Sequence, residues 1–364
     1  TPALGIRSSA GGFDRSRHTN GATTMRVLHV IPDYRLDEPQ LAVLEFCRVA
    51  RMRGVQVSVL ALCGEGQAAR QLLDEQMVST QELVTEASGG LEMQILQESV
   101  DIVQTHTAGD FSRVMPAVLE ADVRLVHAFH NCQLASREDF PAGRGFESQA
   151  TWVNGIPGAL RGSSVSEDLL SSIWDGVWSP PIEELDPERQ RAQMGVDADT
   201  LLMGVASHKD VASTIELMMP VRRSLAELGI DSHVAVFGAA EDRDAPDGFT
   251  LVSSDDADLV ERLEGLDLFV QLGDGDFCQL SLLSLARRVP VVLAGDQIVE
   301  PGRGGWTPLR FEPGDIEGLT RQVLRYAQDP EMLDVHRKLA RDYVLVFRDS
   351  MSMVGAYARL YRKP

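Results

Sequence analysis

The chain has 364 residues, of which 44% are apolar and 24% charged. These values are ordinary for a soluble globular protein with room for two domains. The formal net charge of −20 argues against nucleic acid and anionic membrane surfaces as main partners.

The cysteine and hydropathy patterns indicate the cellular compartment of the protein and its relation to membranes. The four cysteines lie far apart without a CxxC pair, which indicates free thiols in a reducing compartment and speaks against a zinc site. No apolar run approaches the roughly 20 residues of a membrane span, and no secretory signal is visible. We therefore expect a cytoplasmic protein without an integral membrane segment.

The first part of the chain predicts alternating strands and helices. Residues 1–24 are rich in Gly, Ser, Thr and Arg and predict a disordered leader, so the structured protein is expected to begin at Met25. A buried strand at 25–31, an amphipathic helix at 40–53 closed by Gly54 and a strand at 55–63 form a β-α-β unit with parallel strands. The pattern continues with strands at 101–106, 123–130 and 163–165 and helices at 111–121 and 167–173.

A proline-containing, charged stretch at 174–200 interrupts this rhythm and predicts a linker. A second α/β run follows, with strands at 201–205, 233–238, 249–252, 268–272 and 289–293 and helices at 211–228, 257–263, 316–327, 330–348 and 351–362. The expected fold class is α/β, with two Rossmann-like, doubly wound parallel sheets facing a cleft.

The stretch 267–292, DLFVQLGDGDFCQLSLLSLARRVPVV, has the order strand, Gly-rich loop, short helix, strand. A loop of this kind at the carboxyl end of a strand, feeding a helix N-terminus, is where open α/β sheets hold phosphates. The sequence therefore predicts a phosphate-binding edge here.

From about Met25 to Tyr361 the chain resembles the retaining, group 1 (family 4-like) glycosyltransferases of the GT-B fold. The order and spacing of several segments carry the resemblance. Residues 25–36 are similar to the family's opening strand, 53–59 to "RGHEVTVL", 100–106 to "PDVVHTH", 124–130 to "PVVVTVHG", 163–167 to "AVSEA", and 257–273 to the helix and "ADVFVLPS". Glu300 and residues 311–315 have the spacing of the family's "PE…PPGD" segment.

The resemblance implies a domain plan. We expect an N-terminal, acceptor-side domain at 25–176, a linker at 177–200 and a donor-side domain at 201–345. A C-terminal helix at 346–364 is expected to cross back onto the N-terminal domain.

Several family motifs are altered in this chain. The Gly-Gly loop after the first strand is replaced by Asp37-Glu38-Pro39, which is expected to reshape the close approach of substrate to the backbone. The family's donor-phosphate Arg corresponds to Val205. Of its two glutamates eight residues apart, the first falls on Asp276 or Gly275 and the second on Ser284 or Leu283, so the donor-site motif is degenerate.

Two residues are candidates for catalysis. In the family's pattern Asp276 would hold donor-sugar hydroxyls, whereas an Asp before a helix is more often an N-cap. His130 would contact the sugar near the reacting carbon, and the alternative is a hydrogen-bonded histidine at a strand end.

The resemblance also implies binding contacts on both sides of the cleft. Lys209 would neutralise a diphosphate, with a solvated loop lysine as the alternative, and Glu300 would lie near the donor or cap a helix. The full donor-side set is Gly204, Lys209, Gly238, Gly273, Gly275, Phe277, Ser284 and Glu300. The acceptor-side set is Asp33, Tyr34, His106 and Asn131, of which His106 is more often structural.

Two functions remain open. The first is transfer of a sugar from a nucleotide-sugar donor to an acceptor, with no metal or other cofactor required. The second is a catalytically inactive protein of the same fold, acting as a partner or regulatory subunit of an active glycosyltransferase or as a binding module. A sugar-nucleotide epimerase is a minor third alternative.

Overall fold

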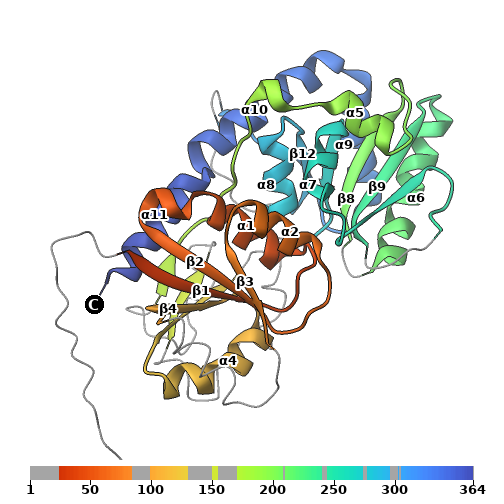
Figure 1. Ribbon diagram of the computed structural model, residues 1–364. Helices are drawn as coiled ribbons and strands as arrows, with labels where there is room; N and C mark the ends of the chain where they lie inside the picture. The colour runs from red at the N-terminus through yellow and green to blue at the C-terminus, as the bar shows by residue number, and fades with distance from the viewer. Residues whose placement is uncertain are drawn as a thin grey trace, which may run out of the picture.

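The computed structural model describes residues 24–83, 99–129, 150–154, 170–207, 210–239, 244–273, 277–295, 302 and 305–363. Within these ranges the chain forms two parallel sheets covered by helices (Figure 1). The α/β fold class with two doubly wound sheets, predicted from the sequence, is confirmed.

The first sheet is formed by strands in the order β3-β2-β1-β4-β5-β6-β7, all parallel. Its strands are β1 (Met25–Ile31), β2 (Val55–Ala61), β3 (Ser79–Glu82), β4 (Ile102–Thr105), β5 (Arg124–Phe129), β6 (Ala150–Asn154) and β7 (Leu170–Ser172). The order reverses between β1 and β4, which pair with Val27 opposite Ile102. That reversal is the point at which ligands bind in doubly wound sheets.

The second sheet repeats this topology in the order β10-β9-β8-β11-β12-β13, again all parallel. Its strands are β8 (Leu201–Ala206), β9 (Ser232–Ala239), β10 (Phe249–Ser253), β11 (Leu268–Gln271), β12 (Val291–Ala294) and β13 (Leu309–Phe311). Here the order reverses between β8 and β11.

Helices cover both faces of each sheet. In the first half they are α1 (Glu38–Ala50), η1 (Arg51–Arg53), α2 (Ala68–Glu75) and α4 (Ala108–Glu120); the chain then passes through η4 (Ile182–Glu184) and α5 (Pro187–Gln193). In the second half they are α6 (Val211–Glu227), α7 (Leu259–Arg262), η5 (Leu263–Gly265), α8 (Gln279–Ala286), α9 (Ile316–Gln328), α10 (Pro330–Phe347) and α11 (Ser350–Tyr361).

The helices begin where the sequence supplies capping residues. Thr107 accepts a hydrogen bond from the backbone N–H of Asp110 at the start of α4, and Asp210, Asp315, Asp329 and Asp349 accept equivalent bonds at the starts of α6, α9, α10 and α11. Such caps satisfy N–H groups that have no partner within the helix. Gly54 adopts a positive φ of 70° after η1, which ends the helical segment and turns the chain into β2.

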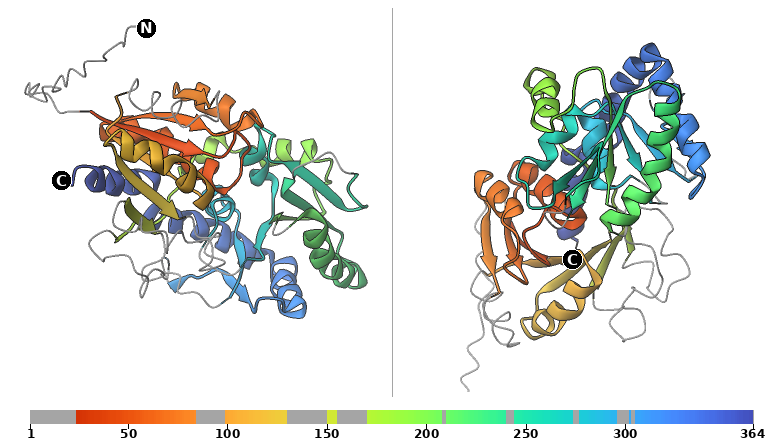
Figure 2. Two further views of the ribbon diagram at one scale, coloured as in Figure 1. Left: turned by 90° about the horizontal axis from the view of Figure 1, so that it is seen from below. Right: turned by 90° about the vertical axis from the view of Figure 1, so that its right-hand side faces the viewer.

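The C-terminal helix returns to the first half, as expected. α11 packs on α1 through Phe46, Val49, Val354 and Tyr357, which share one buried apolar cluster, and the chain ends beside the first sheet (Figures 1 and 2). The crossing is tied at a bridge between Val177 and Asp349, where the two connections between the halves lie side by side.

One predicted element is wrong. The sequence indicated a helix at 167–173, but Leu170–Ser172 is strand β7, which pairs with Trp152–Asn154 of β6. Hydrogen bonding to a neighbouring strand outweighs local helix propensity in a segment this short. The strand pattern also missed β3, β6 and β13, each of three to five residues.

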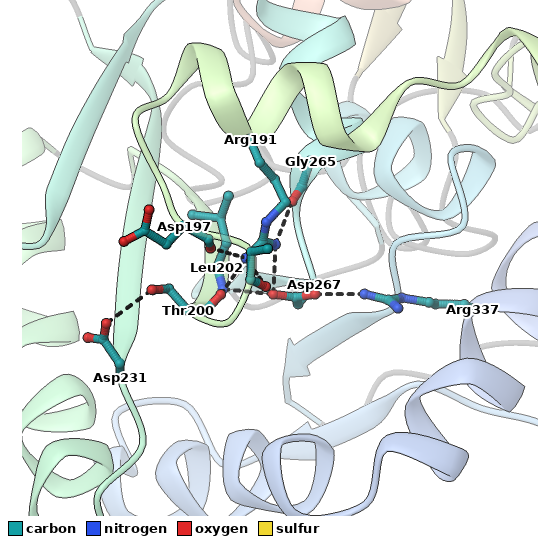
Figure 3. Close-up of polar contacts among 9 residues, drawn as sticks. Arg191, Asp197, Thr200, Leu202, Asp231, Gly265, Asp267 and Arg337 are labelled. Atoms are coloured by element: carbon teal, nitrogen blue, oxygen red, sulfur yellow. Dashed lines mark hydrogen bonds and ion pairs between the residues drawn. The ribbon is translucent and has the colours of Figure 1, made fainter.

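A polar network ties α5 and α10 to the amino end of β11 (Figure 3). Asp267 accepts hydrogen bonds from Arg191 at 3.0 Å, from Arg337 at 2.7 Å and from the backbone N–H of Leu202 at 2.8 Å. Arg191 also donates to the carbonyls of Gly265, Asp197, Ala198 and Thr200. Because this network lies at the amino ends of the strands, opposite the ligand edge, its role is structural.

Candidate functional site

The two switch points bring the predicted ligand residues to one edge of each sheet. Asp33 follows β1 and His106 follows β4, so both lie at the reversal in the first sheet. Ser207 follows β8 and Gly273 lies two residues beyond β11, at the reversal in the second sheet. In doubly wound sheets, ligands bind in a crevice outside the carboxyl ends of the strands at such a reversal.

The two carboxyl edges face each other, because loops that leave them make direct contacts. The N–H of Leu36, beyond β1, donates to the carbonyl of Ser254, beyond β10, at 2.6 Å. The carboxylate of Asp255 accepts from the N–H groups of Gln67 and Ala68 at the start of α2. We call this set of contacts between the two halves the seam.

A carboxylate crosses the seam in the opposite direction. Glu38, the first residue of α1, accepts a hydrogen bond from the N–H of Gln279, the first residue of α8, at 2.8 Å. The two halves therefore cap each other's helices, with Asp255 on α2 and Glu38 on α8.

Apolar side chains fill the seam around these polar contacts. One buried cluster contains Tyr34, Leu36 and Leu41 from the first half together with Phe277 and Leu280 from the second. The described conformation is closed at this point, and the side chains that meet there are mostly apolar.

Asp33 is buried and fully engaged by its neighbours. Its carboxylate accepts from the Arg35 backbone N–H at 2.9 Å and from the Arg35 guanidinium, and Gln40 donates to it at 3.0 Å. Arg35 also lies 3.5 Å from Glu65. The predicted contact between Asp33 and an acceptor stays a prediction. An acceptor that binds Asp33 has to compete with Arg35 for its carboxylate.

Tyr34 points toward the outer part of the first sheet. Its hydroxyl donates to the carbonyl of Gln81 on β3 at 2.6 Å, and the Arg70 guanidinium lies 5.6 Å above its ring. Burial raises the pKa of Tyr34 to about 12, so the phenol stays neutral well above pH 7. An acceptor contact from this side chain remains a prediction.

His106 forms a buried pair with His29. The two rings stack at 5.1 Å between centroids, and Nε2 of His106 lies 2.9 Å from Nδ1 of His29. A second histidine, His127, is hydrogen bonded to Thr105 at 2.7 Å and packs edge-on against Phe111. These contacts are typical of structural histidines, and the acceptor role of His106 stays a prediction.

The predicted donor glycines differ in environment. A Cβ at Gly204, within β8, would lie 2.3 Å from Leu266 and 2.8 Å from Phe269, so a side chain there is excluded by core packing. Gly238 adopts a φ of +83° at the end of β9, and Gly273 lies partly exposed after β11. Among the predicted donor glycines that the structure describes, Gly238 and Gly273 lie at the carboxyl edge where a ligand is predicted.

Phe277 and Ser284 are fully buried. Phe277 packs against Tyr343 of α10, with 5.6 Å between ring centroids. The hydroxyl of Ser284 donates to the carbonyl of Leu280 within α8 at 2.7 Å. Neither side chain has exposed surface for a donor in this conformation, so their predicted contacts require a rearrangement.

The remaining predicted site residues lie outside the described residues. These are Asp276, His130, Lys209, Gly275, Glu300 and Asn131. Their roles stay predictions.

Three residues at the site were missed as functional candidates. Glu38 belongs to the altered loop, and no local signal indicates that it accepts a hydrogen bond from α8, a helix 241 residues further along the chain. Gln279 is fully buried, and among the described residues neither of its amide side-chain atoms has a hydrogen-bond partner. Asp110, in the first turn of α4, is a buried acid whose only sequence signal was the preceding Thr107.

One group of possible metal ligands occurs among the residues that the structure describes. Ligand atoms of Asp33, Cys63 and Glu65 lie within 4.8 Å of one another. Arg35 contacts both carboxylates and supplies the positive charge that a cation would bring. The donor set therefore fits an internal ion pair better than a metal.

Solved structures with the same arrangement identify the fold. A glycosyltransferase from Rickettsia africae ESF-5 matches with a TM-score of 0.70 and 14% identity over 94% of this chain and 98% of that one. Anabaena Alr3699/HepE, solved with UDP-glucose, matches with a TM-score of 0.72 and 14% identity over 92% and 98% of the two chains. The chain has the GT-B fold.

Further comparison supports the same GT-B arrangement. Sucrose-phosphate synthase from Thermosynechococcus elongatus matches with a TM-score of 0.66 and 13% identity over 93% of this chain and 98% of that one. No protein-family model matches the sequence, and no curated protein matches it. Within the described part of the chain, no helix has both the length and the apolar character needed to span a bilayer.

Proposed function

We propose that this GT-B protein acts on a nucleotide-sugar, which it binds at the carboxyl edge of the second sheet, and that it transfers the sugar to an acceptor bound at the first sheet. The observation that carries the proposal is the facing of two switch points across the seam, with Asp33 and His106 on one side and Gly273 on the other. HepE has this fold and was solved with UDP and with UDP-glucose. The similarity in fold makes the same ligand class the first choice.

The proposed chemistry rests on positioning. Backbone N–H groups near Gly238 and Gly273, together with Lys209, would hold the diphosphate, while Asp276 and His130 would contact the sugar. In retaining transfer of this kind the donor phosphate itself can accept the proton of the acceptor, so little acid–base chemistry is asked of the protein. No metal is needed for these steps, and a cytoplasmic location fits a nucleotide-sugar substrate.

A second candidate is a non-catalytic protein that assists an active glycosyltransferase. The specific observations in its favour are the burial of Ser284 and Phe277 and the apolar filling of the seam. In this alternative the protein uses its fold to bind a partner protein. The surface that contacts the partner, and not the donor site, carries the function.

We predict that UDP or GDP binds with a dissociation constant on the order of 100 μM or weaker, since a lost charged hydrogen bond costs about 1.5–3 kcal/mol. Isothermal titration calorimetry checks this. Micromolar affinity would contradict the non-catalytic alternative. If transfer activity is found, Asp276→Ala is expected to abolish turnover, and a fully active variant would remove Asp276 from the site.

A further inference from the structure

The N-terminus of α8 is a place in the described part of the second half where an anion is favoured. α8 follows the switch-point strand β11, and its first-turn N–H groups and helix dipole favour negative charge. The helix has no acidic residue of its own in the first turn, and no side chain of its own caps it. Among the described residues, the negative charge that reaches this helix end comes from elsewhere in the chain.

That charge is the carboxylate of Glu38, 241 residues away in sequence. Glu38 is partly buried, and its Oε1 lies 2.8 Å from the N–H of Gln279. The neighbouring N–H, of Cys278, donates to Gln271 at 3.0 Å. Two amides at the start of α8, those of Cys278 and Gln279, are therefore engaged by side-chain oxygens of the protein itself.

The side chain of Gln279 is a second, independent observation at the same point. It has no exposed surface, and within the described residues both its Oε1 and its Nε2 are without hydrogen-bond partners. A buried amide left unsatisfied in this way costs free energy. The polar capacity of this buried position is therefore unused in the closed conformation, and a polar ligand reaches it only when the seam opens.

We propose that Glu38 is an internal anion that occupies the α8 N-terminus in place of a ligand phosphate, so that the described conformation is an autoinhibited closed state. This inference rests on the proposed nucleotide-sugar function. Binding of a nucleoside diphosphate then requires the carboxylate to leave the N–H of Gln279, because two anions cannot share one helix end without repulsion. The alternative is that Glu38 serves only as a cap that joins the two halves.

The test compares three proteins by calorimetry: the unmodified chain, its Glu38→Gln variant and its Asp255→Asn variant. Glutamine keeps an oxygen that can accept from Gln279 but removes the charge, so the fold is kept while the competition weakens. Asp255→Asn is the matched control, since it removes the reciprocal charge from the seam without contacting α8.

UDP is expected to bind Glu38→Gln about tenfold more tightly than the unmodified chain, the size of a charge-assisted contact, and Asp255→Asn is expected to stay within about twofold. Equal affinity of the unmodified chain and Glu38→Gln would overturn the autoinhibition while leaving the proposed function standing. A similar gain in both variants would also overturn it, because general loosening of the seam would then be the cause.

Inorganic pyrophosphate serves as a second probe that separates the two proposals. If Glu38→Gln gains affinity for pyrophosphate but neither UDP nor UDP-glucose binds any of the three proteins, the anion exchange stands and the nucleotide-sugar function fails. If neither pyrophosphate nor nucleotide binds any of them, both proposals fail.

Discussion

At the scale of single residues, Asp110 shows how burial changes a carboxyl group. Its side chain is 3% exposed, and within the described part of the chain its Oδ2 has no hydrogen-bond partner. Burial raises the pKa of Asp110 from 3.8 to about 7, against hydrogen bonds from Thr107 that lower it, and nearby Asp33 raises it further. Asp110 is therefore protonated in the folded protein at pH values where the unfolded chain has already lost the proton.

We predict that Asp110→Asn removes a pH dependence of stability. A folded pKa above the unfolded one gives stability that is present below about pH 4 and lost as the pH rises to about 7, at about 1.4 kcal/mol per pH unit. Between pH 5 and pH 8 the free energy of unfolding of the wild type should fall by about 2–3 kcal/mol relative to that of the variant. Urea denaturation at both pH values measures this difference. The variant Asp199→Asn, at an exposed position, should show the same pH dependence as the wild type. The raised pKa of Asp110 would be contradicted if the stability of Asp110→Asn also changed with pH as that of the wild type does.

Single residues also show that a sequence pattern does not predict the direction in which a side chain faces. Ser284 was singled out because of its distance from Asp276, and Phe277 because of its place in the donor segment. Distance along the chain does not say which way a side chain faces, and both side chains face the interior. The burial of Gly204 has the same origin, since its neighbours Leu266 and Phe269 come from β11 and the turn before it.

At the scale of elements, α8 is stabilised at both ends by charges that complement its dipole. Glu38 lies at its N-terminus, and Arg287, immediately after its last residue, contacts Glu264 at 3.5 Å. All the residues of α8 are buried, so the helix is a core element whose start lies at the carboxyl edge of the second sheet. The two strands and the helix predicted within 267–292 are confirmed as β11, α8 and β12, whereas residues 274–276 of the predicted loop lie outside the described residues.

A second element, α5, depends on one arginine. Arg191 reaches Asp267 and several backbone carbonyls at once, which a planar guanidinium can do and a lysine ammonium cannot (Figure 3). We predict that Arg191→Lys lowers the free energy of unfolding by about 1–3 kcal/mol. Thermal and urea denaturation measure the loss. Arg189→Lys, at an exposed position of the same helix, is the matched control, and equal stability of the two variants would mean that the network contributes little.

At the scale of the whole molecule, the described residues join the two halves at the crossover at Val177 and Asp349, at the return of α11 to α1, and at the seam. The crossover and the packing of α11 involve backbone pairing and a buried apolar cluster. The seam adds the reciprocal caps of Glu38 and Asp255. Opening of the seam is therefore expected before any loss of either sheet.

We predict that the double variant Glu38→Ala/Asp255→Ala opens the seam selectively. The amides of Gln67, Ala68 and Gln279 should exchange faster with solvent, because their acceptors are gone, whereas amides within β1 and β8 should keep their protection. Hydrogen exchange read by NMR or mass spectrometry measures this. Unchanged protection of the three amides would show that apolar packing alone closes the seam.

The sequence by itself determined the class, the order of most elements and the return of the last helix, because alternating apolar strands and amphipathic helices leave one family of parallel topologies. Asp33, His106 and Gly273 come at the ends of predicted strands and lie beyond β1, β4 and β11 in the structure, and their roles stay predictions. Only the tertiary structure decided that Glu38 meets α8, that Asp255 meets α2 and that Ser284 faces inward. These contacts join residues far apart in the chain, and their partners are chosen by how the two halves close against each other, which no local pattern encodes.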